Sequence, residues 1–270
     1  MKVFCILSDE RAYSSKSPAM FSRVLQRVGI QAVYVPFKVE PQNVGQAVQS
    51  LKVLNIAGAN VTVPFKEKVI PHLDVLSEGA NIIGAINTIV CNGDCLKGYN
   101  TNAIGLMDAL NDAGFEVAGK SALVFGTGGA AKAAVFMLNW LRARTILVAG
   151  RRPDKTNEIA ERFEVEGCSI EELVDRPIAA DIVLNTTSVS SPEEAPELEK
   201  VVQNLHLRGC QMILDLNYGR SQNFWQDLAK CKGIRFMDGL ATLAFQARRT
   251  FALWTKVQVA PVEFINALKT

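Results

Sequence analysis

The chain lacks a strong excess of charge of either sign. Its 29 lysine and arginine residues nearly balance 27 aspartate and glutamate residues, which gives a formal net charge of +2. This balance does not call for nucleic acid or an anionic membrane as a partner. No apolar run is long enough to cross a bilayer, and the N-terminal MKVFCILSDE soon becomes polar. We therefore expect a cytoplasmic monomer or homodimer whose partner is a small molecule.

Cysteine is too scattered for a metal site. The close pair Cys91 and Cys95 has no second pair of ligands nearby, and the other four cysteines lie far apart along the chain. A structural zinc site normally takes four such ligands. Internal repeats and low-complexity tracts are also missing. We expect reduced thiols and no bound metal.

Alternating strand and helix patterns are present instead. The length of 270 residues, 49% of them hydrophobic, suits one or two globular domains. Strand–helix alternation predicts α/β domains with a mostly parallel sheet. The predicted strands in the first part are Val3–Leu7, Ala32–Pro36 and Ile56–Val63. The predicted helices are Pro18 to about Val28, which Gly29 would end, Asn43–Leu54, and Lys66–Leu76, which Pro71 must kink or break.

A hairpin follows in the segment INTIVCNGDCLKGYN. Asn92-Gly93 is a strong signal for a two-residue turn. With that turn, Cys91 pairs with Asp94 and Asn87 lies opposite Gly98, which brings Asn87 toward Asn100 and Asn102 at one end of the hairpin. These three asparagines either serve a ligand or cap turns.

The segment SALVFGTGGAAKAA, residues 121–134, predicts a buried strand, a glycine turn and a helix. Gly126, Gly128 and Ala131 fit the pattern G-x-G-x-x-G/A. The first glycine permits a tight turn, the second lets the backbone approach a pyrophosphate, and the small third residue lets helix and strand pack closely. The N–H groups at the start of the helix then face the anion. Glycine turns also occur in proteins that bind no nucleotide.

The later strands form a second group that begins with this turn. We predict strands at 122–125, 145–149, 181–185 and 212–216, a loop at 190–196, and helices at 101–113, 153–163, 224–230 and 240–254. The final helix would return to the first domain. The predicted domains are therefore 1–101 plus 239–270, and 102–238 as a Rossmann-like domain, with a ligand cleft between them.

Two arginines follow the strand after the glycine turn. Gly150-Arg151-Arg152 stands where NAD enzymes usually place an acidic residue for the ribose hydroxyl. Guanidinium groups bind phosphate bidentately, so this segment favours NADP over NAD. A solvated basic turn is the alternative, and Asp154 weighs slightly against NADP.

Two further segments carry groups suited to a small polyhydroxylated ligand. NVTVPFK ends a buried strand in Lys66, whose pKa would fall in a closed site to a range useful for proton transfer. The loop before Pro18 holds three hydroxyls, Ser14, Ser15 and Ser17, of which Ser17 is also a helix-capping candidate.

Over nearly its whole length the chain resembles the shikimate dehydrogenase family. The motifs that carry the resemblance occur in family order: SKSP (15–18), GANVTVPFKE (58–67), GAINT (84–88), YNTNAIGL (99–106), GTGGAAKA (126–133), NTTS (185–188), DLNYG (215–219), DGL (238–240) and Gln246. GANVTVPFKE is the most specific of them.

The resemblance implies reversible, NADP-dependent oxidation of shikimate to 3-dehydroshikimate in aromatic amino acid biosynthesis. It implies a catalytic role for Lys66 and position 102, and substrate contacts from Ser15, Ser17, Thr62, Lys66, Asn87, Asn102, Tyr218 and Gln246. The cofactor would be bound by Gly126, Thr127, Gly128, Gly129, Ala130, Ala131, Gly150, Arg151, Arg152, Thr186, Thr187, Ser188 and Gly239.

One position departs from the family pattern. The family reads N-T-D where this chain has Asn100-Thr101-Asn102. Asparagine keeps the shape but cannot carry a proton or a charge, and the missing carboxylate would lower the Lys66 pKa. The chain is then a disabled variant of an ordinary enzyme, a relative with slower chemistry or another substrate such as quinate or a similar cyclohexene polyol, or a non-catalytic binding protein.

Overall fold

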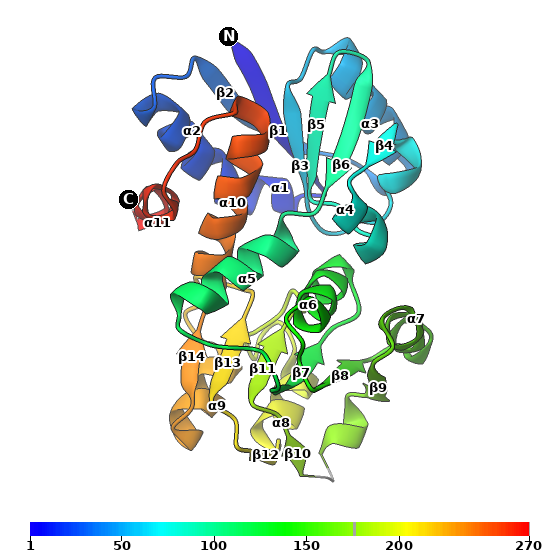
Figure 1. Cartoon of the computed structure of the whole chain (residues 1–270), viewed down its shortest axis with the longest axis vertical. Coiled ribbons are helices and arrows are strands. Elements are labelled where there is room, and N and C mark those ends of the chain that lie inside the picture. Colours follow the sequence, from blue (N-terminus) through cyan, green and yellow to red (C-terminus); the bar gives the residue numbers. More distant parts are fainter. Residues whose placement is uncertain (175–176, 270) are drawn as a thin grey trace. The chain divides into compact units, whose positions relative to one another are not determined.

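The computed structural model describes residues 1–174 and 177–269. The chain forms two compact units. Unit 1 comprises Met1–Gly105 with Leu243–Thr270, and unit 2 comprises Leu106–Thr242. Each unit has its own six-stranded sheet (Figure 1).

The sheet of unit 1 has the strand order β2-β1-β3-β5-β6-β4. β1 is parallel to β2 and β3, whereas β5 is antiparallel to β3 and β6. The mixture follows from the hairpin, which joins two neighbouring strands through a short turn. The strands are β1 (Lys2–Ser8), β2 (Ala32–Lys38), β3 (Gly58–Val61), β4 (Val75–Leu76), β5 (Thr88–Asn92) and β6 (Cys95–Tyr99).

An aromatic cluster supports this sheet. Phe4 stacks on Trp254 with ring centroids 4.7 Å apart, and Phe21 stacks on Tyr34 at 5.0 Å. A Cβ on Gly58 would lie 2.2 Å from the Trp254 indole nitrogen, so this position has room only for glycine. The helices of unit 1 are α1 (Arg11–Ser14), α2 (Ser17–Arg27), α3 (Val44–Val53), α4 (Glu78–Ile83) and α11 (Pro261–Lys269); α5 (Asn102–Asp112) and α10 (Gly239–Thr255) belong partly to each unit.

The sheet of unit 2 is entirely parallel, in the order β14-β13-β11-β7-β8-β9. Numbered from β7 along the chain, this is the 3-2-1-4-5-6 order of a Rossmann fold, in which ligands bind at the carboxyl ends where the order reverses. Here that point lies between β7 and β11. The strands are β7 (Ser121–Phe125), β8 (Thr145–Gly150), β9 (Glu166–Ser169), β11 (Ile182–Asn185), β13 (Met212–Asp215) and β14 (Arg235–Met237).

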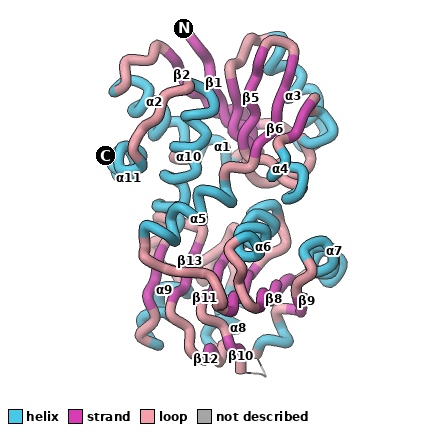
Figure 2. Tube along the Cα trace, in the orientation of Figure 1, coloured by secondary structure: helices cyan, strands magenta, loops and turns pink. Residues whose placement is uncertain are grey.

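α-Helices lie between most successive strands of the unit 2 sheet, in keeping with its parallel pairing (Figure 2), whereas β9 is followed by the 3-10 helix Glu171–Leu173. Phe125, Val183 and Ile213 on the strands pack with Trp225 and Leu228 in one buried core. The helices are α6 (Gly129–Trp140), α7 (Pro153–Phe163), α8 (Pro196–Gln203) and α9 (Phe224–Lys232), and the short strands β10 (Ile178–Ala179) and β12 (Leu207–Arg208) pair separately.

The predicted helix Lys66–Leu76 is wrong. The segment contains turns, a short 3-10 helix at Ile70–His72 around Pro71, and β4. The Lys66 carbonyl accepts from Ile86 N (2.8 Å), and Asp74 N donates to Leu96 O (3.0 Å). The backbone is thus held by the neighbouring hairpin, and Pro71 could not have donated within a helix.

The predicted hairpin register is also wrong, by two residues. Asn92 pairs with Cys95, so the turn residues are Gly93 and Asp94. Gly93 adopts φ 59, which glycine tolerates well as the first turn residue. Asn87 N donates to Tyr99 O (3.0 Å), which places Asn87 beside the Asn100–Asn102 segment rather than opposite Gly98.

Most other predicted elements are present with small shifts in their ends. The predicted strand Ile56–Val63 is shorter, Gly58–Val61, and Pro196 begins α8 rather than ending a loop. The chain continues beyond α10 into α11, which the sequence interpretation missed. Within the described residues, no helix is long and apolar enough to span a membrane. All six cysteines are free thiols.

Candidate functional site

Asn87 organises a cluster of amide side chains in unit 1. Its Oδ1 accepts from the Thr101 backbone N–H at 2.7 Å. Its Nδ2 lies 2.8 Å from Thr101 Oγ1, 2.8 Å from Asn102 Oδ1 and 3.2 Å from Gln246 Oε1. The hairpin, the start of α5 and α10 therefore bring three predicted substrate residues, Asn87, Asn102 and Gln246, into one group.

Close packing of α5 against α10 places Gln246. A Cβ on Gly105 would lie 2.6 Å from the Gln246 backbone nitrogen, so the two helices approach closely only because residue 105 is glycine. Asn100 has the other role foreseen for the asparagines, since its Oδ1 accepts from the N–H groups of Asn102 (3.0 Å) and Ala103 (3.3 Å) and caps α5.

Three buried threonine hydroxyls lie behind this cluster. Thr250 Oγ1 is 2.9 Å from Thr88 Oγ1 and 3.1 Å from Thr101 Oγ1. Thr101 is also the acceptor for Asn87, so the α10 hydroxyl supports the amide group from inside the unit. Fully partnered buried networks of this kind fix side-chain orientation.

The network continues through Asn60 to Tyr34. The Tyr34 hydroxyl donates to Asn60 Oδ1 (2.8 Å), and Asn60 Nδ2 donates to the Asn87 carbonyl (3.0 Å). Burial raises the pKa of Tyr34 well above its ordinary value of 10.0, while a hydrogen bond from Ser17 opposes this shift. Sequence interpretation missed Tyr34, Asn60 and Thr250 as supporting residues.

Lys66 lies beside the amide cluster along the backbone, because its carbonyl accepts from Ile86 N. Burial lowers the pKa of the Lys66 ammonium from 10.5 to about 8. Among the described residues, the ammonium has no hydrogen-bond or ion-pair partner. It is therefore mostly protonated at pH 7 but can release its proton under mildly alkaline conditions.

The serine loop precedes α2. Ser15 Oγ accepts from Ser17 N (3.2 Å), while Ser17 is the first residue of the helix rather than its cap. The Ser17 hydroxyl is already engaged with Tyr34. Thr62 follows β3 and precedes Lys66 by four positions in the sequence. Its side chain is partly buried.

The glycine turn of unit 2 follows β7, at the point where the strand order reverses. Gly126 adopts φ 112, and a Cβ there would lie 2.6 Å from Thr186 Oγ1. At Gly128 a Cβ would meet nothing within 4 Å, which leaves open space against the backbone. α6 begins at Gly129, Ala130 is in its first turn, and Ala131 is fully buried. The geometry is that of a turn which presents helix N–H groups to an anion.

Three residues around the turn have packing roles. A Cβ on Gly150 would lie 2.5 Å from the Thr127 methyl and 2.3 Å from Thr156 Oγ1. Arg151 and Arg152 then lie exposed at the end of β8, and neither guanidinium has a partner among residues 1–174 and 177–269. Two unpaired arginines at this edge fit a phosphate group.

The NTTS segment follows β11. Thr186 donates to the Phe125 carbonyl (2.6 Å) and Thr187 to Asn185 Oδ1 (2.7 Å), so both hydroxyls shape the loop, while Ser188 is exposed. Buried Asp215, at the end of β13, accepts from Asn185 Nδ2 (2.8 Å) and Asn223 Nδ2 (2.7 Å). The carboxylate thus ties together the ends of two strands.

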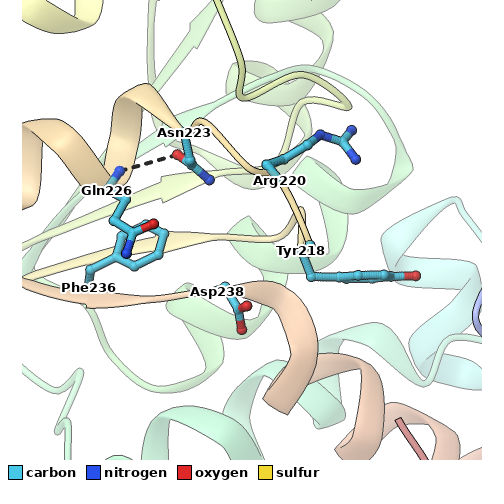
Figure 3. A pocket seen from close by; sticks show the side chains of 7 residues that line it. Tyr218, Arg220, Asn223, Gln226, Phe236 and Asp238 are labelled. Atoms are coloured by element: carbon cyan, nitrogen blue, oxygen red, sulfur yellow. Dashed lines mark hydrogen bonds between the residues drawn. The ribbon is translucent and has the colours of Figure 1, made fainter. Parts of the chain in front are cut away.

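A hollow of about 290 Å³ adjoins Asn223, the residue that donates to Asp215. In Figure 3, Asn223, Gln226 and Phe236 gather on one side of it, and Tyr218 and Arg220 point to the other. Its lining comprises Tyr218, Gly219, Arg220, Asn223, Gln226, Phe236 and Asp238. Gly239 packs nearby: a Cβ there would lie 2.1 Å from the Leu216 carbonyl oxygen.

The parallel sheet of unit 2 and its glycine turn define a Rossmann-like dinucleotide-binding protein, with a separate α/β unit that carries a lysine and an amide cluster. The family model of the shikimate dehydrogenase substrate binding domain matches residues 10–89, and that of shikimate / quinate 5-dehydrogenase matches residues 109–237. The chain belongs to the shikimate dehydrogenase family.

Individual relatives agree with the family models. The shikimate dehydrogenase (NADP(+)) of Desulforamulus reducens is 38% identical over 261 residues, which cover 93% of this chain and 89% of that protein. The crystal structure of shikimate dehydrogenase from Aquifex aeolicus has a TM-score of 0.88 and 30% identity, and covers 100% of this chain and 98% of its own. The Thermus thermophilus shikimate 5-dehydrogenase, in complex with NADP(H) and shikimate, has a TM-score of 0.86 and 28% identity, with 100% and 99% coverage.

Proposed function

We propose that the protein is an NADP-dependent shikimate dehydrogenase that interconverts shikimate and 3-dehydroshikimate. The observation that carries this proposal is the Asn87 cluster, in which the Asn87 side chain binds both Asn102 and Gln246. The preceding residue, Ile86, donates its backbone N–H to the Lys66 carbonyl and so holds the Lys66 segment beside the cluster. The whole-length similarity to NADP(+) shikimate dehydrogenases supports the same activity. Ser15, Ser17 and Tyr218 are proposed to contact the ring carboxylate, and Thr62 and Asn87 the ring hydroxyls.

NADP is the cofactor that unit 2 suits. The open space at Gly128 permits close approach of a pyrophosphate to the backbone, and the unpaired Arg151 and Arg152 fit the ribose 2′-phosphate. We assign the wider contact set to the segments 126–131, 150–152 and 186–188 with Gly239. NADP, when bound, supplies or accepts the hydride.

Lys66 is the group proposed to move the proton. In the direction of reduction its ammonium donates a proton to the oxygen that was the carbonyl; in oxidation the neutral amine takes the hydroxyl proton. Because burial lowers the Lys66 pKa to about 8, oxidation should accelerate as pH rises through about 8. Asn102 offers no carboxylate to share this work.

We propose a substrate-binding domain of residues 1–101 plus 239–270 and an NADP-binding domain of residues 102–238, as domain boundaries rather than as sets of ligand contacts. The match of the substrate-domain model to residues 10–89 supports the first assignment. Free cysteines are in keeping with a cytoplasmic location, and we propose a monomer or homodimer without nucleic acid or membrane partners.

The decisive test follows the absorbance of reduced cofactor after mixing the protein with shikimate and NADP⁺, in parallel with quinate and with NAD⁺. We expect turnover to be fastest with shikimate and NADP⁺. Lack of turnover on every member of this panel, for both the unaltered chain and its Asn102→Asp variant, would refute the proposal. A clear preference for quinate would instead identify the related polyol dehydrogenase.

Asn102 specifically favours a second candidate, a ligand-binding homologue with weak or no catalysis. This protein would bind shikimate and NADP in calorimetry, yet show no turnover until Asn102→Asp restores the carboxylate. Turnover by the unaltered chain as fast as that of the Asn102→Asp variant removes this candidate.

A further inference from the structure

The direction of the Asn87 amide is fixed by chemistry. Its Oδ1 receives the Thr101 backbone N–H, which can only donate. The Asn87 NH₂ group must therefore face the other way, toward Asn102 and Gln246. An NH₂ group has no acceptor to offer, so each of these two side chains has to turn its oxygen toward Asn87.

The orientation of Asn102 and Gln246 follows from this. With both oxygens directed at Asn87, both NH₂ groups are directed away from it. Neither NH₂ group has a partner among residues 1–174 and 177–269. Among the described residues, Trp225 Nε1 is the single side-chain nitrogen or oxygen atom that is both buried and without a hydrogen-bond partner. Because the two NH₂ groups also have no partner, they cannot be buried and are therefore open to solvent.

The unpaired polar groups of this cluster are consequently hydrogen-bond donors. Asn102 Nδ2 and Gln246 Nε2 both donate, as does the ammonium of Lys66, whose backbone carbonyl binds the neighbouring Ile86 N–H. None of these groups accepts in this orientation and charge state. An aspartate at 102 would present a second acceptor oxygen in place of the NH₂ group. A ligand hydroxyl could donate to that oxygen, whereas a ligand carbonyl could not.

We propose that Asn102 determines specificity as a hydrogen-bond donor to the reacting oxygen, so that the site binds the ketone 3-dehydroshikimate more tightly than the alcohol shikimate. A carbonyl oxygen accepts from Asn102 and Lys66 together and carries no hydrogen that needs an acceptor. The alcohol must direct its hydroxyl hydrogen elsewhere. The inference rests on the proposed function and deepens it.

The test compares equilibrium binding of shikimate and of 3-dehydroshikimate by calorimetry, without cofactor, at pH 7. For the unaltered chain, we expect the Kd of shikimate divided by the Kd of 3-dehydroshikimate to exceed one. In Asn102→Asp this ratio should fall on the order of tenfold, because the ketone then lacks a hydrogen-bond donor at position 102 and the alcohol gains an acceptor. Asn111→Asp is the matched control, because it adds the same charge to an exposed position of α5. Its ratio should not change.

The possible outcomes separate the two proposals. If neither ligand binds to any version of the protein, the proposed function fails. If both ligands bind and Asn102→Asp leaves their ratio unchanged, the donor role of Asn102 is overturned while the function stands. If Asn102→Asp does not fold, Asn102→Leu removes the same donor without adding a charge, and it should lower the ratio of the alcohol and ketone Kd values in the same direction. An unchanged ratio there likewise overturns the inference.

Discussion

The two units present their candidate residues in opposite ways. In unit 1, side chains hold one another: Asn87, Asn102 and Gln246 share hydrogen bonds, and Thr250 and Tyr34 extend the network into the interior. In unit 2, the residues proposed to bind the cofactor instead comprise open backbone at Gly128 and arginines without partners in the described chain. Unit 1 is thus built for a ligand of one fixed pattern of donors and acceptors, whereas unit 2 offers space, N–H groups and charge to phosphate.

Among variants that test this difference between the units, Lys66→Met should have the largest effect on turnover. Turnover should fall by about 10²–10⁴, with a much smaller change in shikimate affinity, because proton transfer acts in the transition state. Steady-state kinetics and calorimetry measure the two quantities. The exposed neighbour Lys68→Met is the control. Equal losses in turnover and affinity would mean that Lys66 only positions the ligand.

The same Lys66→Met variant should be more stable at pH 7. The folded pKa of about 8 lies below the unfolded 10.5, so keeping the ammonium in the folded state costs at most about 3 kcal/mol. This cost is fully present below pH 8 and disappears as pH rises toward 10.5. The gain in free energy of unfolding, measured with urea, should shrink over that range; a constant gain would contradict the pKa shift.

Arg151→Ala tests recognition by charge in unit 2. Loss of a charge-assisted hydrogen bond should weaken NADP binding by about 10- to 150-fold and leave NAD binding nearly unchanged. Titration with each cofactor measures the difference, and the exposed Arg208→Ala serves as control. Equal weakening of both cofactors would exclude a contact with the 2′-phosphate.

Two glycine variants separate folding from binding within one turn. Gly126→Ala should lower the free energy of unfolding by about 1–3 kcal/mol, because φ 112 and the Thr186 hydroxyl both oppose a Cβ. Gly128→Ala should change the free energy of unfolding by no more than about 0.5 kcal/mol, because its Cβ enters only open space. It should nevertheless weaken NADP binding, because that space is where the pyrophosphate is proposed to approach the backbone. Normal NADP affinity in a folded Gly128→Ala protein would place the pyrophosphate elsewhere.

The smallest effect on activity is expected from Tyr34→Phe. It removes the donor to partly buried Asn60 Oδ1 while keeping the ring stacked on Phe21, and should cost about 1–3 kcal/mol of stability. The Michaelis constant for shikimate should rise more than turnover falls, because Asn60 supports Asn87 from behind. Tyr13→Phe, at an exposed position, is the control. An unchanged Michaelis constant would confine the Tyr34 hydroxyl to a structural role.

Local patterns predicted the parts of the fold that local forces decide. The strand, turn and helix around Gly126–Ala131 and the helix Pro153–Phe163 needed only apolar spacing, glycine and proline. The segment after Lys66 failed because distant partners in the hairpin, not local propensity, satisfy its backbone. The hairpin register failed because Gly93 occupies the first turn position, which a turn centred on Asn92 did not anticipate.

For the candidate site, motif spacing suggested Asn87, Asn102 and Gln246, which the structure brings together. Tyr34 and Thr250 lie outside the motifs, and Asn60 lies within GANVTVPFKE without a role assigned to it there. The partners of all three residues lie far away in sequence. Whether an amide points its oxygen or its nitrogen at a neighbour is likewise decided by tertiary contacts, here by the Thr101 N–H.

The buried indole of Trp254, stacked on Phe4 in unit 1, has a counterpart in Trp225, buried within the core of unit 2. Each half of the chain thus carries its own fluorescent reporter. Once the exposed Trp140 is replaced by phenylalanine, emission from variants that retain one of the two remaining indoles would follow the melting of either half separately.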